Sequence, residues 1–254
     1  MKIVVCYKIV PSDEGVVVNT DRSLKFLDNE IEISAYDMNA IEAAVRLAAS
    51  YENSTVIGLT ANGDLVENTK LRKAALSRGL TEVYAVKGEG LGNADPFVTA
   101  SVLKATVEKI GFNVIICGEG SGDLYNQQVG NLLGCMLGLP TINKVSKITA
   151  SDDKIVVERI TASGVDVLEV SGPAVLSVTS DISIPRIPSM RDILGAGKKT
   201  FTVLNQGDLL QAPTSKTEVL CVASPELSDR RKVIVDGSTD DGLQAFWDNI
   251  FRLV

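Results

Sequence analysis

The sequence of 254 residues contains no histidine. Histidine is the commonest general base in enzymes and the commonest metal ligand, so its absence argues against Ser-His-Asp hydrolases and most metal sites. The four cysteines lie far apart, at Cys6, Cys117, Cys135 and Cys221, and form no CxxC pair. We interpret them as buried apolar residues in a reducing compartment. A hydrolase or a metalloenzyme is therefore disfavoured, and we expect no metal site.

The sequence also lacks a basic surplus and any long apolar run. Its 25 Lys and Arg residues face 32 Asp and Glu residues, for a net charge of -7, whereas a nucleic-acid-binding surface needs positive charge. No apolar stretch reaches the length of a transmembrane helix, and Met1-Lys2 leads into a strand-like run rather than a signal peptide. We therefore expect no nucleic-acid partner, no direct membrane insertion and a cytoplasmic location.

What the sequence does contain, over residues 1–140, is an alternation of apolar runs and amphipathic segments. Apolar runs bounded by turn residues are typical of buried parallel strands, and the amphipathic segments are typical of helices. The expected strands are 2–8, 55–60, 82–86 and 112–117. The expected helices begin near 34–37, at a capping box over 64–67, at Asp95-Pro96 and just before the apolar segment that Pro140 ends. Right-handed crossovers would join such strands into a parallel α/β sheet.

The most informative stretch runs from Phe112 to Gly138. A strand is followed by three glycines, Gly118, Gly120 and Gly122, and then by a polar segment that leads into a helix. This arrangement presents unpaired backbone N–H groups and a positive helix end to an anion. A simple tight turn would also require glycines, and the loop matches neither GxGxxG nor GxxxxGK[ST]. Because ligands bind at the carboxyl ends of such strands, we predict one nucleotide-sized site touching residues 6–7, 60–62 and 118 onward.

After Pro140 the pattern becomes rich in short strands. We expect strands at 143–150, 154–160, 165–170 and 174–179, with a half-exposed antiparallel hairpin among them. The segment 180–190 has two prolines flanking an arginine, and we interpret it as an extended partner-contact loop rather than a plain connection. From Thr200 onward the chain should be weakly organised, apart from a strand at 232–236 and a terminal helix at 242–254. The aromatic residues of that helix either cap its own domain or dock on a second chain.

Four patches of sequence carry a resemblance to a known family. They are VVCYK at 4–8, SAYDMNAIEAA at 34–44, GEGSGD at 118–123 with QQVG at 127–130, and PRIPSM at 185–190 with GKK at 197–199. In this order and spacing they resemble the β subunit of electron transfer flavoproteins, over nearly the whole chain. Within that family the sequence is most similar to the bacterial Fix-type branch.

The resemblance implies an α/β fold with a Rossmann-like parallel sheet of the adenine-nucleotide-hydrolase-like type, a β-rich addition and a partner-docking C-terminal segment. Residues 1–200 would form the nucleotide-binding domain, including a recognition loop at about 181–199. Residues 201–254 would form an arm whose helix contacts an α subunit, and the α subunit would hold the redox-active FAD. This chain would bind AMP, or a second FAD in electron-bifurcating members. It would act as an electron carrier without catalytic residues.

The resemblance also implies which residues act. The nucleotide-binding positions would be Cys6, Ser34, Asp37, Thr60, Gly118, Ser121, Gly122, Asp123, Asn126, Gln127, Gln128 and Val129. The loop itself supports these positions: from their place near the helix N-terminus, we expect the backbone N–H groups of residues 122–126 to hold the phosphate, and Asp123 to cap the helix or accept a hydrogen bond from a ribose hydroxyl. Pro185, Arg186 and Met190 would dock on an acyl-CoA-dehydrogenase-like or reductase partner, with Met190 as the apolar anchor.

The loop after residue 118 departs from both patterns of the family. Bifurcating members show DGDTAQVG and ordinary members show a run of acidic residues ending NQTG, whereas this chain has DLYNQQVG at 123–130. We therefore favour AMP, or no tightly held ligand, over a second FAD. Two rival interpretations are a stand-alone nucleotide-binding regulator of the universal-stress type and an ATP pyrophosphatase. The β-rich segment argues against the first, and the absence of an SGGxDS-like loop after the first strand argues against the second.

Overall fold

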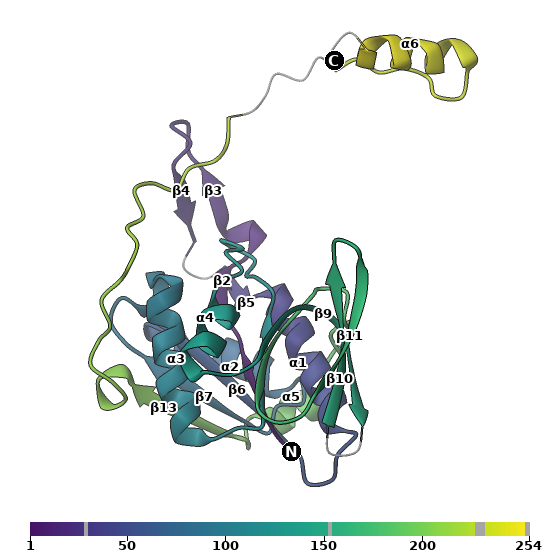
Figure 1. The fold of residues 1–254 in the computed structure, drawn as a ribbon. Helices are drawn as coiled ribbons and strands as arrows, with labels where there is room; N and C mark the ends of the chain where they lie inside the picture. The colour runs from purple at the N-terminus through teal and green to yellow at the C-terminus, as the bar shows by residue number, and fades with distance from the viewer. Residues whose placement is uncertain (28–29, 152–153, 227–231, 252–254) are drawn as a thin grey trace. The chain divides into compact units, whose positions relative to one another are not determined.

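The computed structural model describes residues 1–27, 30–151, 154–226 and 232–251 (Figure 1). The chain forms two compact units. Residues 1–17 and 25–221 make up the first, which contains the main sheet, and residues 18–24 and 222–254 make up the second. None of the helices in the described part of the chain is both long enough and apolar enough to cross a membrane.

The first unit is built on one nine-stranded sheet in the order β11-β10-β9-β12-β8-β1-β6-β7-β13. Seven neighbouring strands of this sheet, β9-β12-β8-β1-β6-β7-β13, run parallel to one another. At the β9 edge, β10 and β11 add an antiparallel hairpin. The predicted α/β class, with a parallel sheet and a β-rich addition, is confirmed. The bounds are β1 Lys2–Cys6, β6 Thr55–Asn62, β7 Glu82–Lys87, β8 Val114–Gly118, β9 Thr141–Ser151, β10 Lys154–Thr161, β11 Gly164–Val170, β12 Ala174–Val178 and β13 Thr200–Asn205.

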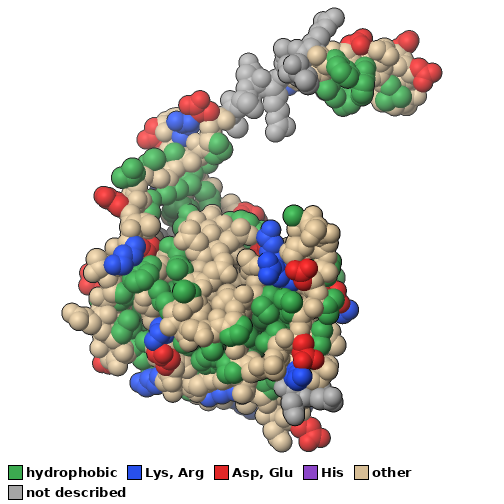
Figure 2. Space-filling model, in the orientation of Figure 1, with side chains coloured by type: hydrophobic (Ala, Val, Ile, Leu, Met, Phe, Trp, Pro, Cys, Tyr) green, Lys and Arg blue, Asp and Glu red, His purple; other side chains and the backbone are tan. Residues whose placement is uncertain are grey.

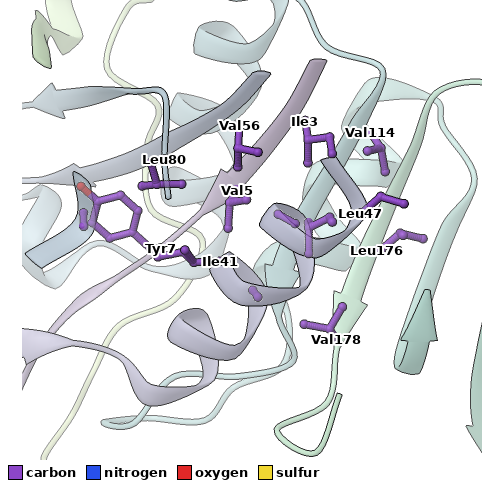
Figure 3. Close-up of a cluster of buried hydrophobic side chains, with 14 of the residues drawn as sticks. Ile3, Val5, Tyr7, Ile41, Leu47, Val56, Leu80, Val114, Leu176 and Val178 are labelled. Carbon is purple, nitrogen blue, oxygen red and sulfur yellow. The ribbon is translucent and has the colours of Figure 1, made fainter. Parts of the chain in front are cut away.

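Helices cover both faces of the parallel part of this sheet (Figure 1). They are α1 Ala35–Ala48, α2 Thr69–Leu76, α3 Pro96–Ile110, α4 Val129–Leu137 and the short α5 Met190–Ala196. Successive side chains of a strand point to opposite faces. Ile3 and Val5 of β1 therefore pack with Ile41 and Leu47 of α1, in the cluster that Figure 3 shows.

The opposite face of β1 packs against the other pair of helices. Val4 and Cys6 lie in a second cluster with Leu103 of α3 and Leu133 of α4. Because both faces of β1 are buried beyond Lys2, its residues 3–6 are all apolar and form one continuous apolar run rather than an alternation.

Smaller elements complete the described chain. They are β2 Ile9–Pro11 paired antiparallel with β5 Ile31–Ile33, the two-stranded sheet of β3 Val16–Val18 and β4 Leu24–Phe26, four short 3-10 helices at Asp13–Gly15, Asp64–Glu67, Leu91–Asn93 and Gln206–Asp208, and α6 Asp240–Phe251. On the face in Figure 2, acidic and basic side chains are interspersed rather than gathered by sign.

Three predictions about local structure are wrong. The expected capping box over 64–67 forms a 3-10 helix instead, and α2 begins at Thr69 because the Asn68 side chain accepts the N–H groups of Lys70 and Leu71. The chain after residue 200 is not weakly organised at its start: Thr200–Asn205 pairs in parallel register with β7 as the edge strand of the sheet. Residues 232–236 form no strand, because no other strand pairs with them in the described chain.

The terminal helix and the cysteines give mixed outcomes. The predicted helix at 242–254 is present as Asp240–Phe251, and its expected end at 252–254 lies outside the described residues. Cys6 and Cys117 are buried as predicted, but Cys135 and Cys221 are exposed. Cys135 lies on an outward-facing position of α4, and Cys221 lies in a segment without regular structure, so neither position requires an apolar side chain.

Candidate functional site

The order of the strands changes direction at β1. The chain runs from β1 to β6 and β7 on one side, and then returns through α3 to place β8 on the other side of β1. In open parallel sheets, ligands bind beside the carboxyl ends of the strands at such a switch point. A cavity of about 120 Å³ lies there, lined by residues 6–8 at the end of β1, by Ala61 and Asn62 of β6, and by residues 117–121 at the end of β8. The structure thus brings together the three predicted strand ends.

The remaining walls come from the starts of two helices. Pro96, Thr99 and Leu103 of α3 line the cavity, as do Leu91, Gly92 and Ala94 before it, and Leu124 with residues 126–130 of the loop and first turn of α4. The first N–H groups of a helix have no acceptor within the helix, and this end carries a partial positive charge. Asp95 accepts the N–H of Val98 in α3, whereas Gln128 makes no side-chain cap at α4. The first turn of α4 is therefore the better donor for an anionic ligand.

Asp37 joins the ends of β1 and β8 behind the cavity. Its Oδ2 accepts the backbone N–H of Lys8 at 2.7 Å and its Oδ1 accepts that of Gly118 at 3.2 Å. Burial raises the pKa of the Asp37 carboxyl to about 7, although these two hydrogen bonds favour the charged form. Asp37 lies in the first turn of α1 and also lines the cavity, so the helix fixes the separation of the two strand ends that a ligand would touch.

Two glycines are required by close contacts beside the cavity. A Cβ on Gly118 would lie 2.6 Å from Oδ1 of Asp37, and a Cβ on Gly120 would overlap the ring of Tyr125. That ring packs against Tyr36 of α1, with 5.0 Å between the ring centroids. The glycines therefore do more than form a tight turn, because they admit the carboxylate and the aromatic ring that hold the loop against α1.

The rim of the cavity carries an ion pair. Nζ of Lys8 lies 2.6 Å from Oδ2 of Asp123, and the hydroxyl of Ser121 donates to Oδ1 of Asp123 at 2.6 Å. Partial burial would raise the pKa of Asp123, but the Lys8 ammonium and the Ser121 hydroxyl outweigh it and hold the pKa below its usual value. The prediction that Asp123 caps the helix is wrong, because α4 begins at Val129 and the carboxylate is taken by Lys8 and Ser121.

Two of the expected phosphate donors are already engaged. The N–H of Gly122 donates to Oγ of Ser34 at 3.3 Å, and the N–H of Tyr125 donates to the carbonyl of Ser121 at 3.2 Å. Ser34 precedes α1 without capping it through its side chain. The backbone of residues 122–126 therefore uses part of its donor capacity to stabilise the loop itself.

The twelve predicted nucleotide-binding residues divide into two groups. Eight line the cavity: Cys6, Asp37, Gly118, Ser121, Asn126, Gln127, Gln128 and Val129. Four do not: Ser34, Thr60, Gly122 and Asp123, although they lie at its edge or next to lining residues. Within the described chain, the buried hydroxyl of Thr60 makes no hydrogen bond. Asn62 lines the cavity as part of the strand end expected at 60–62, whereas Lys8, just after β1, was missed. The lining residues between 91 and 103 were also missed, because only the return of α3 brings them to the cavity.

The segment 180–189 is held on α1 by polar side chains. The guanidinium of Arg186 donates to both carboxylate oxygens of the buried Glu42, at 2.7 and 3.2 Å. Burial would raise the pKa of Glu42, but the hydrogen bonds from Arg186 and Arg46 hold it below its usual value. Asn39 donates to the carbonyls of Ser180 and Ser183 at 2.8 and 2.5 Å. These contacts fix a segment that has no regular secondary structure of its own.

The apolar side chains of this segment point outward. Ile184 is 84% exposed, Ile187 is 94% exposed and Met190 is 71% exposed. Met190 does not extend the loop as predicted but begins α5, where Ser189 and Asp192 form a capping box. A fixed backbone that presents exposed apolar side chains is typical of a surface for binding another protein.

The chain matches a protein-family model. That model is described as the electron transfer flavoprotein domain, and it matches residues 24–209. The matched range includes Asp37, the loop between β8 and α4, and the whole segment 180–199, and it leaves out β1 and residues 6–8. It covers more than half of the chain.

Proposed function

The chain belongs to the electron transfer flavoprotein family, and on that premise we propose that it is the β subunit of a heterodimeric electron transfer flavoprotein of the Fix-type branch. Proteins of this family are electron carriers. In this proposal the α subunit holds the redox-active FAD, and the heterodimer passes electrons from an acyl-CoA-dehydrogenase-like or reductase partner to a second redox partner. The present chain contributes no catalytic residue and acts in the cytoplasm.

The observation that carries the proposal is the cavity at the switch point between β1 and β8. Two helix N-termini meet there, and their N–H groups suit a phosphate. The amides of Asn62, Gln127 and Gln128 suit the polar edges of a base or a ribose, while Leu91 and Leu103 offer apolar contact. Such a composition, mostly apolar with a few convergent polar groups, is typical of small-ligand sites.

We propose AMP as the ligand of this chain, rather than a second FAD. The nucleotide supplies no chemistry here: it stabilises the folded subunit because it binds the folded state alone. The packing of Tyr125 on Gly120 and Tyr36 supports this choice. That packing fills space beside the loop and leaves less room there for a ligand larger than AMP.

Two surfaces are proposed for partners. The segment with Pro185, Arg186 and Met190 would dock on the dehydrogenase or reductase, because its backbone is anchored through Glu42 and its apolar side chains are exposed. The helix α6 would contact the α subunit. None of its described residues is buried, and Trp247 and Phe251 pack on each other with 4.5 Å between centroids. An amphipathic helix without a core of its own gains stability when it docks on a partner.

The stand-alone regulator of the universal-stress type is the weaker alternative. Such a chain would end soon after its fourth or fifth strand, whereas here the sheet continues through β9, β10, β11 and β12. The family match also extends to residue 209, beyond the anchored segment 180–189.

The test is a count of ligands in the purified heterodimer. The chain would be co-expressed with an α subunit of the same family and genome, and the complex would be denatured to release its nucleotides. One FAD and one AMP per heterodimer is the expected result. Two FAD and no AMP would show a bifurcating subunit and overturn the choice of ligand. Failure to form a complex or to retain any flavin would contradict the assignment as a β subunit.

A further inference from the structure

Lys8 stands out among the residues around the cavity because of its charge. Among the described residues that line the cavity, it is the only lysine or arginine. The other ionisable side chains there are two carboxyl groups, two thiols and one phenol, those of Asp37, Glu119, Cys6, Cys117 and Tyr7. A phosphate in the cavity would therefore meet one cation only, together with the two helix N-termini.

Lys8 is anchored through its backbone, whereas its ammonium group is partly exposed. Its backbone N–H is fixed by the buried Asp37 at 2.7 Å. Its ammonium group lies at the rim, where the Lys8 side chain is 37% exposed and its partner Asp123 is 23% exposed. A lysine side chain has four rotatable carbons and a compact charge, so the ammonium can leave Asp123 and turn inward without any change in the backbone.

In the structure, Asp123 is the anion that holds the ammonium group of Lys8. It retains the hydroxyl of Ser121 at 2.6 Å as a second partner, so it would remain partly satisfied if the ammonium moved away. Partly exposed ion pairs contribute little net free energy, whereas a lysine that meets a phosphate inside a cavity makes a charge-assisted hydrogen bond of about twice the neutral strength. The exchange of one anion for the other is thus favourable once a phosphate binds.

We propose that Lys8 binds the phosphate of the nucleotide, and that the carboxylate of Asp123 competes with that phosphate for the Lys8 ammonium. The ligand class is a nucleoside monophosphate, and the inference rests on the proposed function of the cavity. It assigns opposite roles to two residues in contact. Lys8 increases affinity for the phosphate and Asp123 decreases it, although the family resemblance implies that Asp123 assists binding.

The experiment is a calorimetric titration of the full chain, in its complex with the α subunit and stripped of nucleotide, with AMP and with adenosine. Adenosine lacks the phosphate and reports contacts to the base and ribose alone. The variants are Lys8→Met and Asp123→Asn. The matched controls are Lys104→Met and Glu108→Gln, because Lys104 and Glu108 form an ion pair of the same 2.6 Å length on α3, and neither residue lines the cavity.

Lys8→Met is expected to weaken AMP about ten- to hundredfold, the usual worth of a hydrogen bond to a charged group, and to leave adenosine unchanged. Asp123→Asn is expected to tighten AMP several-fold and to leave adenosine unchanged, because the freed ammonium no longer has a competing anion. Both controls should bind AMP as the wild type does.

Two outcomes overturn the inference. If Lys8→Met and Asp123→Asn both weaken AMP and adenosine alike, the ion pair only holds the loop in place. If Asp123→Asn weakens AMP and adenosine while Lys8→Met changes neither, Asp123 contacts the ribose and Lys8 has no role. A wild-type complex that binds neither AMP nor adenosine would contradict the proposed ligand itself, which is a different failure and is visible before any variant is made.

Discussion

The N–H of Gly118 at the end of β8 donates to the buried carboxylate of Asp37 at 3.2 Å, although Asp37 lies 81 positions earlier in the chain. The other oxygen of the same carboxylate accepts the N–H of Lys8, after β1. One side chain of α1 therefore ties together the two strand ends between which the cavity opens. The geometry of the site depends on this pair of hydrogen bonds more than on the glycines alone.

The first prediction concerns Gly118→Ala. The added Cβ would lie 2.6 Å from Oδ1 of Asp37 and 2.9 Å from the backbone of Tyr36, neither of which is the free end of a flexible side chain. We expect the free energy of unfolding to fall by about 1–3 kcal/mol, as for other overpacked sites, and AMP to be lost on purification. Urea unfolding and nucleotide content are the measurements.

Gly195→Ala is the control for that substitution. Gly195 lies inside α5, and a Cβ there meets no atom within 4 Å. Alanine is favoured over glycine in a helix interior by about 0.5–1 kcal/mol, so the control should be neutral or slightly more stable. Equal losses in both variants would show that the contact with Asp37 is not the cause.

The second prediction concerns pH and Asp37. Its pKa is raised from 3.8 to about 7 in the folded chain, mainly by burial. The folded state therefore binds this proton more tightly than the unfolded state does. The resulting stability is fully present below about pH 4 and is lost as the pH rises to about 7, with a slope of at most about 1.4 kcal/mol per pH unit from one proton.

Asp37→Asn isolates this contribution. The variant cannot titrate at this position. The unfolding free energy of the wild type minus that of the variant should therefore fall as the pH rises from 5 to 7, and it should become constant above pH 8. Urea unfolding in the same buffers at each pH measures it. A difference that stays constant across this range, or grows with pH, would contradict the assignment of the raised pKa to Asp37.

The sequence predicted the parallel strands and the cavity because both follow from local patterns. Continuous apolar runs such as 3–6 mark strands buried on both faces, and parallel strands necessarily end at one edge of their sheet. The residues after β1, β6 and β8 could therefore be expected to meet. The roles of Ser34 and Asp123 could not be, because they depend on which partner each side chain finds across the loop.

The errors share one physical origin, which is competition between a local signal and its surroundings. The 64–67 pattern suits a helix start, but Asn68 provides a better cap one turn later. Residues 232–236 have strand propensity without a partner strand in the described chain, whereas Thr200–Asn205 has β7 beside it. Strand propensity is realised only where backbone hydrogen bonds can be completed.

The third prediction concerns Met190→Glu, a test of the proposed docking surface. A charge at a 71% exposed position should leave the fold, the nucleotide content and the heterodimer unchanged. It should lower the rate of electron transfer from the dehydrogenase or reductase at least tenfold at limiting concentrations, because a charge would have to be desolvated in an apolar contact.

Val167→Glu is the matched control. Val167 is 67% exposed and lies on β11, outside the segment 180–199. Its substitution should not alter the rate. Equal slowing by both variants would indicate an effect of net charge, and no slowing by Met190→Glu would place the docking surface elsewhere.

The last prediction concerns Asp95, where one carboxylate serves two elements. Its Oδ1 caps α3 through the N–H of Val98 at 2.7 Å, and its Oδ2 accepts the Ser215 hydroxyl at 2.8 Å and the Lys216 N–H at 2.7 Å. Partial burial would raise its pKa, but these hydrogen bonds hold it at about 2. The stability it contributes is therefore present above about pH 4 and is lost as the pH falls toward 2.

Asp95→Ala should remove both functions at once. Loss of the cap alone costs about 1 kcal/mol, and the segment 215–217 should lose its protection against amide hydrogen exchange because it is tied to α3 through this carboxylate. In Asp95→Asn, the side-chain oxygen can still accept the N–H of Val98. The amide NH₂ then occupies the place of Oδ2 and cannot accept the N–H of Lys216. This variant should therefore retain the cap and still release 215–217. Exchange measured by mass spectrometry separates the two effects: unchanged protection of 215–217 in both variants would show that other contacts hold the segment, and loss of protection in the alanine variant alone would show that the cap governs it.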